Sequence, residues 1–129
     1  MLTGYFAKVK NYPHGKGYEY VSIARYNKFW RGREYKKLAP PPEIIKLEGE
    51  EYKKQYYEKV LCRLDPKQVY EELGENAVLL CYESWESIKN GRATCHRRVV
   101  AKWLEDNLGI KVYELGEMCE QTNFLQQKS

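Results

Sequence analysis

The sequence has no long apolar run and few of the residues that bind metals or build disulfide networks. No hydrophobic stretch approaches the roughly 20 residues needed to span a bilayer, so we expect no membrane segment. The mixed residues at the N-terminus do not resemble a signal peptide. The four cysteines include no C-x-x-C pair, and there are only two histidines. These absences predict a cytoplasmic protein without a disulfide framework, a metal site or a cofactor.

The common phosphate-binding motifs are also missing. Neither G-x-x-x-x-G-K-[ST] nor G-x-G-x-x-G occurs in the chain. Cysteine phosphatases have an arginine six residues after their catalytic cysteine, and neither Cys81 nor Cys95 is followed by one at that distance. Ser87 holds that place after Cys81, and Ala101 holds it after Cys95. A phosphate site in this chain would need another arrangement.

The composition is that of a globular protein. The 129 residues are 43% hydrophobic and 31% charged, which suits one domain with a useful core. We find no internal repeat and no linker, and we expect residues 121–129 to be loosely held. The sequence does not indicate the oligomeric state.

Hydrophobic patterning predicts strands and helices in alternation. Residues 77–82 form a continuous apolar run, which is typical of a strand buried on both faces of a sheet. The spacing of apolar residues predicts three helices, and Asp65-Pro66 and Gly109 mark a helix start and a helix end. We therefore expect a small α/β domain with a mainly parallel sheet and flanking helices. The predicted strands are 2–9, 18–25, 77–82 and 110–115, and the predicted helices are 50–62, 65–74 and 94–108, with an irregular segment at 26–42, a short helix possible near 43–47, and a polar connection at 85–92.

The start of helix 94–108 is the most informative feature of the chain. We expect Thr94 to be its N-cap, so its first turn carries a thiol, an imidazole and two guanidinium groups. Cations at a helix N-terminus cost roughly 0.3–1 kcal/mol each, and Glu105 and Asp106 lie near the opposite, negative end. A bound anion at residues 94–98 would explain the N-terminal half of this pattern.

Several reactive side chains are predicted to meet at one edge of the sheet. Ligands of parallel α/β sheets bind at the carboxyl ends of the strands. Cys95 at a helix start should be a reactive thiol, or else simply a small packed residue. His96 would act as acid or base, or as a capping side chain, and Glu83 would orient it or carry a second proton. Cys81 is either a core residue or takes a direct part in the chemistry of the site.

The ligand-binding candidates are mostly basic. Guanidinium groups offer paired donors to phosphate oxygens. Adjacent helical residues point about 100° apart, so we favour Arg97 over Arg98 as the one that faces a pocket. The full set of predicted ligand-binding residues is Arg25, Thr94, Arg97, Arg98 and Trp30.

Residues 25–37 combine basic and aromatic side chains. Six basic residues and one acid give this segment a local charge of +5. Its aromatic residues, which include Trp30, could stack on nucleic-acid bases while the cations neutralise phosphates. An equally strong reading is that the tyrosines of the chain build its core.

Two motifs resemble a known family. The sequence resembles the bacterial and viral domain-of-unknown-function family numbered four hundred and eighty-eight (DUF488) at Leu79–Glu83 and at Cys95–Arg98, which leads into residues 99–105. There is further similarity at 22–25 and 30–41. The hallmark of that family is a strand ending in Cys-x-Glu and a helix starting with Cys-His-Arg. The resemblance implies a small α/β fold without an assigned activity, and the connection 84–94 is longer than in the family pattern. The implied motif positions are Arg25, Cys81, Glu83, Cys95, His96 and Arg97.

These observations lead to one main hypothesis and three alternatives. The main hypothesis is a pocket that binds, and could act on, a phosphorylated anionic small molecule such as a nucleotide or nucleoside derivative. The alternatives are nucleic-acid binding through residues 25–37, sulfur transfer or redox chemistry by Cys81 and Cys95, and a binding protein without turnover. The sequence leaves open whether the protein is an enzyme.

Overall fold

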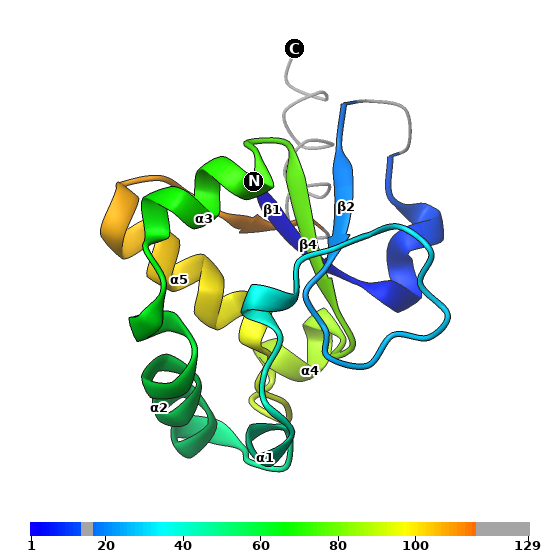
Figure 1. The fold of residues 1–129 in the computed structure, drawn as a ribbon. Coiled ribbons are helices and arrows are strands. Elements are labelled where there is room, and N and C mark those ends of the chain that lie inside the picture. The colour runs from blue at the N-terminus through cyan, green and yellow to red at the C-terminus, as the bar shows by residue number, and fades with distance from the viewer. Residues whose placement is uncertain (14–16, 116–129) are drawn as a thin grey trace, which may run out of the picture.

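The fold is built on one five-stranded sheet, seen in a computed structural model that describes residues 1–13 and 17–115 (Figure 1). The strands are β1 Leu2–Tyr5, β2 Glu19–Ser22, β3 Arg33–Glu34, β4 Ala77–Cys81 and β5 Tyr113–Glu114. Their order in the sheet is β3-β2-β4-β1-β5, and every pairing is parallel. The predicted α/β class with a mainly parallel sheet is confirmed. The predicted loose tail, 121–129, lies outside the described residues.

Helices cover the two faces of the sheet unequally. Figure 1 shows α2, α3 and α5 gathered on one side of the sheet, with the short helix η1 on the other side. The helices are α1 Pro42–Ile45, α2 Gly49–Lys59, α3 Pro66–Leu73, α4 Trp85–Lys89 and α5 His96–Leu108, and the 3-10 helices are η1 Phe6–Asn11, η2 Lys36–Leu38 and η3 Leu61–Arg63. None of the helices in the described ranges combines the length and the hydrophobicity needed to cross a membrane.

The central strand β4 explains why the site forms where it does. All five of its residues are buried, as its continuous apolar run predicts. Leu79 belongs to the core beneath the helices, whereas Val78 and Leu80 belong to the core on the other face. Because side chains alternate along a strand, Cys81 shares the face of Leu79 and is directed toward the helical side.

Several predicted boundaries are wrong by a few residues. Strands 2–9, 18–25 and 110–115 are each shorter than predicted, and the first ends where η1 begins. The sequence predicts neither the three 3-10 helices nor two further elements: β3, inside the segment expected to be irregular, and α4, inside the polar connection. The first turn of α4 is capped by Ser84, whose hydroxyl accepts a hydrogen bond from Ser87 N at 3.2 Å. The capping of α3 by Asp65 is confirmed, because its carboxylate accepts from Lys67 N at 3.1 Å.

Candidate functional site

A pocket of about 260 Å³, here called the polar pocket, opens at the carboxyl ends of β2 and β4. It brings together five of the residues predicted for the site: Arg25, Cys81, Glu83, Thr94 and His96. The start of α5 forms one of its walls. This arrangement agrees with the rule that parallel sheets bind ligands at the carboxyl ends of their strands. Sequence reasoning missed other lining residues, among them Glu48, Tyr52, Tyr82 and Arg92.

The two buried cysteines of the site are joined to each other. Cys81, the last residue of β4, and Cys95, just before α5, form a disulfide with the sulfur atoms 1.95 Å apart. This bond departs from the prediction of a chain without a disulfide framework. It also brings together two residues that are 14 positions apart in sequence, as the redox alternative requires. Glu83 reaches the same point, with Oε2 3.5 Å from Cys81 Sγ.

His96 is buried beside this sulfur pair in one defined tautomer. Its Nε2 lies 2.8 Å from the carbonyl oxygen of Ile23, which can only accept, so Nε2 carries the proton. The other ring nitrogen, Nδ1, therefore presents its lone pair, 4.0 Å from Cys95 Sγ. Burial lowers the pKa of His96 to about 4, against the raising effect of the hydrogen bond to Ile23 and with a smaller lowering effect of Arg97. At neutral pH His96 is thus a neutral acceptor, which suits a base and not an acid among the roles predicted for it.

Arg97 points into the protein, so the prediction that it faces a bound anion is wrong. It is fully buried, at 0% exposure. Its Nε and Nη2 donate to the two carboxylate oxygens of Glu114 at 3.0 and 2.9 Å. Its Nη1 donates to Glu83 O at 2.7 Å and to Cys81 Sγ at 3.1 Å. The guanidinium thus positions the residues that follow β4, and its anion is an internal carboxylate.

The charges that oppose the dipole of α5 have partners within the protein, one of them in α5 itself. Arg98 Nη1 donates to Thr3 Oγ1 at 2.8 Å and to Val112 O at 2.9 Å. Glu105 Oε2 accepts from Val112 N at 2.9 Å, and Asp106 pairs with Lys102 at 3.2 Å. With Arg97 paired to Glu114, a bound anion is not required to explain the charges of this helix.

Thr94 does not cap α5, because Cys95 occupies that position. The Thr94 hydroxyl instead accepts a hydrogen bond at 3.1 Å from the backbone N of Gly49, the first residue of α2. This bond ties the segment before α5 to the start of another helix. Thr94 still lines the polar pocket, where the sequence predicts a ligand-binding residue.

The segment 25–37 is largely engaged within the chain. Arg33 donates to Glu19 at 2.7 Å and to two backbone carbonyls, and Lys37 pairs with Glu72 at 3.1 Å. Lys36 donates to the carbonyl oxygens of residues 24 and 25. The indole of Trp30 donates to Arg33 O at 2.9 Å and its ring packs near Phe6, so it lines neither pocket. These contacts weaken the support for a nucleic-acid surface here and correct the ligand-binding role of Trp30.

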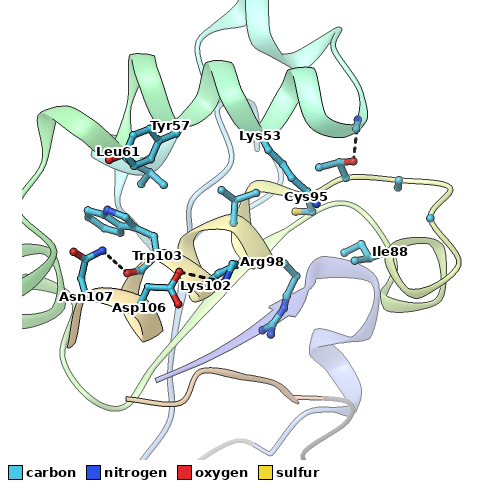
Figure 2. A pocket seen from close by; sticks show the side chains of 15 residues that line it. Lys53, Tyr57, Leu61, Ile88, Cys95, Arg98, Lys102, Trp103, Asp106 and Asn107 are labelled. Atoms are coloured by element: carbon cyan, nitrogen blue, oxygen red, sulfur yellow. Dashed lines mark hydrogen bonds and ion pairs between the residues drawn. The ribbon is translucent and has the colours of Figure 1, made fainter. Parts of the chain in front are cut away.

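A second, larger pocket of about 700 Å³, here called the helical pocket, lies between α2 and α5 (Figure 2). Apolar side chains such as Leu61 and Trp103 line it, with charged Lys53 and Lys102 among them. Cys95 lines this pocket, whereas Cys81 lines the polar pocket, and Thr94 lines both. The disulfide therefore lies between two cavities of different character.

The Arg97–Glu114 pair gives a direct test of this geometry. Glu114→Leu leaves a buried guanidinium without a counter-charge, so we expect the free energy of unfolding to fall by about 3–5 kcal/mol. Denaturant unfolding measures this loss. The double variant Arg97→Met/Glu114→Leu removes both charges and should recover most of it. A double variant as unstable as the sum of the two single variants would contradict a charge-pairing role.

The depressed pKa of His96 predicts how stability depends on pH. Between the folded pKa of about 4 and the unfolded value near 6.5, the unfolded chain binds more protons at this site. Its contribution is complete above pH 6.5 and is lost as the pH falls toward 4, by about 3 kcal/mol in total. Denaturant unfolding of the oxidised protein across this range, compared with His96→Gln, isolates the effect. Parallel pH profiles for the two proteins would refute it.

Comparison with known proteins adds nothing to this geometry. No family model, no curated protein and no solved structure matches the chain. The interpretation of the site accordingly rests on its own residues.

Proposed function

We propose that the protein binds a small anionic molecule, a phosphorylated nucleotide or nucleoside derivative, in the polar pocket. The observation that carries this proposal is the lining itself, in which two arginines and two exposed tyrosines line the same cavity as Cys81 and His96. These tyrosines are Tyr26 and Tyr82, which are 60% and 49% exposed. Guanidinium groups match phosphate oxygens, and an exposed aromatic ring offers a face on which a base can stack.

Arg25 is positioned to donate to a phosphate. Its Nε donates to the carbonyl oxygen of Pro40 at 2.5 Å, which fixes the side chain. Its two terminal nitrogens make no hydrogen bond to residues 1–13 or 17–115. Arg92, on the connection between α4 and α5, supplies the second cation of the lining.

The pocket also favours a ligand with more than a phosphate. Glu48 and Glu83 line it together with the two arginines, so its four charged side chains sum to zero. Carboxylates accept hydrogen bonds from hydroxyl and amino groups, which a sugar and a base would provide. A bare phosphate ion would leave these acceptors unused. The lining thus supports a nucleotide-like molecule over inorganic phosphate.

Membership of DUF488 is part of this proposal. Five motif positions implied by that resemblance lie together: Cys95 at the wall between the two cavities, and Arg25, Cys81, Glu83 and His96 in the polar pocket. The convergence of residues from three separate segments supports a shared site. The sixth position, Arg97, supports it from beneath through Glu83 O and Cys81 Sγ.

Isothermal titration with a nucleoside monophosphate, the matching nucleoside and inorganic phosphate tests the proposal. We expect saturable binding of the monophosphate, and weakening by about 10- to 100-fold in Arg25→Ala or Arg92→Ala through loss of a charge-assisted contact. Arg63→Ala, an exposed arginine outside the pocket, is the matched control. Absence of saturable binding, or equal weakening by Arg63→Ala, would reject the proposal.

Thiol–disulfide chemistry is a second candidate, favoured by the bond between Cys81 and Cys95. In this reaction a small-molecule thiolate attacks one sulfur, forms a mixed disulfide with that cysteine and releases the other cysteine as a thiolate. A second small-molecule thiolate then attacks the small-molecule sulfur of the mixed disulfide and releases the first cysteine. The products are the protein dithiol and a small-molecule disulfide, so two thiols are oxidised as the protein is reduced. Arg97 donates to Cys81 Sγ and stabilises it as the leaving thiolate. Attack is thus expected at Cys95, from the helical pocket.

Trapping of the mixed disulfide tests this direction of attack. In a Cys62→Ser/Cys119→Ser background only Cys81 and Cys95 remain, so glutathione added to the oxidised protein can form a mixed disulfide at either of them. We expect it at Cys95, located by mass spectrometry after rapid alkylation of the released thiol. A mixed disulfide at Cys81 would reverse the assignment. A wild-type disulfide that glutathione does not reduce would reject the activity in the reducing cytoplasm, where we propose the protein works.

A further inference from the structure

We propose that Cys81, Cys95 and His96 bind one zinc-type divalent cation when the disulfide between the two cysteines is reduced. The two sulfur atoms and a ring nitrogen of His96 all lie within 4.8 Å of one another, and all three residues are buried. The sequence predicts no metal site because these residues lack a metal-binding spacing. The fold supplies the convergence by bringing the end of β4 against the start of α5. The inference depends on a reducible disulfide but not on nucleotide binding.

The distances suit such an ion after a small adjustment. Zinc binds sulfur at about 2.3 Å and nitrogen at about 2.1 Å, which places tetrahedral S and N ligands about 3.6 Å apart. The observed separation of Cys95 Sγ and His96 Nδ1 is 4.0 Å. The two sulfurs must separate to about 3.8 Å. Their Cα atoms are 7.4 Å apart, beyond the span of about 4.4–6.8 Å common in disulfides, so side-chain rotation can provide this opening.

The surroundings already orient the ligands as metal sites require. Metal-bound histidines usually donate their second ring N–H to a carbonyl or carboxylate, which fixes the tautomer. His96 does so through Nε2 to Ile23 O at 2.8 Å, leaving Nδ1 on the side of Cys95. Arg97 Nη1, 3.1 Å from Cys81 Sγ, is a donor to the thiolate at that position. Both outer contacts exist without the ion.

The charges of the buried group balance only with a divalent cation. Two thiolates carry two negative charges, and a zinc-type ion neutralises them. The charge of Arg97 is already neutralised by Glu114, with which it shares full burial. Cysteine binds zinc as a thiolate, so binding of one cation to the protonated dithiol releases two protons, and atoms and charge balance.

The geometry leaves one coordination position open. Cys81 and His96 both line the polar pocket, so a ligand there can reach the fourth position. Glu83, whose Oε2 is 3.5 Å from Cys81 Sγ, lines the same pocket. Three protein ligands with an accessible fourth position are typical of reactive zinc sites, whereas structural sites are closed by four. Oxidation by a small-molecule disulfide, which is reduced to two thiolates, joins the two cysteine sulfurs and expels the ion, so redox state controls occupancy.

Titration of Co²⁺ into reduced protein tests the inference. The protein is reduced with excess dithiothreitol, desalted without oxygen, and its four thiols are counted before the metal is added. We expect one ion per chain, the charge-transfer absorption of cobalt thiolates, the visible bands of tetrahedral Co²⁺, and release of about two protons. Zn²⁺ should displace the cobalt and bleach both absorptions. Reduced protein that binds no ion would overturn the inference, whereas an incomplete thiol count would show that reduction itself had failed, which is the failure of the redox candidate.

Two controls separate this site from the remaining cysteines. Oxidised wild-type protein has the same sequence and fold and should show none of the cobalt bands, whereas Cys62→Ser/Cys119→Ser, when reduced, should keep them in full. In that background Cys81→Ser should lose saturable binding, and His96→Cys should restore a site with stronger charge-transfer absorption than His96→Ala. Equal binding by the oxidised and reduced forms, or loss of the bands in the Cys62/Cys119 double variant, would overturn the inference even if the buried-residue variants fail to fold.

Discussion

The buried ion pair between Arg97 and Glu114 is the interaction on which the site depends. A guanidinium in the core must have a counter-charge and satisfied donors, because the desolvated charge is otherwise very costly. Glu114 supplies the charge, and Thr3 donates to the same carboxylate at 2.8 Å. From that anchor Arg97 reaches past β1, with its guanidinium 5.5 Å from the ring of Tyr5, to Glu83 O and Cys81 Sγ. One side chain thus connects the ends of three neighbouring strands and fixes the sulfur of Cys81.

The sequence predicts the parts of this arrangement that depend on local patterns. The apolar run of β4 and the apolar stripe of α5 identify the strand and the helix whose junction forms the site. The parallel arrangement then places Arg25, Cys81 and His96 at one edge of the sheet. What the sequence could not supply is the direction in which Arg97 points. Its partner lies seventeen residues later, in a strand of only two residues. One signal was available, since Glu114 shares by alternation the face of the buried Val112, and an acid on a core face needs a cation.

The same reasoning explains why the charges that oppose the dipole of α5 do not indicate a bound ligand. A dipole argument treats a helix as isolated, whereas tertiary partners within the first and last turns are worth more than the dipole. Arg98 and Glu105 both bond to Val112, one at its carbonyl and the other at its amide. These contacts hold the segment before β5 against both ends of α5. The cationic helix start therefore attaches the segment before β5, and the anion binding that we propose depends on arginines outside the helix.

The position of the sulfur pair between two cavities connects the proposals. A disulfide there presents Cys95 to the helical pocket and Cys81 to the polar pocket, whereas an ion held by the reduced pair would face the polar pocket. The two states cannot coexist, because each uses the same sulfur electrons. A molecule with a phosphate and a hydroxyl or amino group, seated between Arg25, Arg92 and Glu83, would meet a neutral disulfide in one state and an electrophilic cation in the other. Since an ion with an open coordination position can bind a phosphate oxygen directly, redox state would change both the affinity and the chemistry of the pocket through one bond. The neutral His96 serves either state, because its lone pair is held toward Cys95 by the hydrogen bond to Ile23 whichever partner the sulfur has.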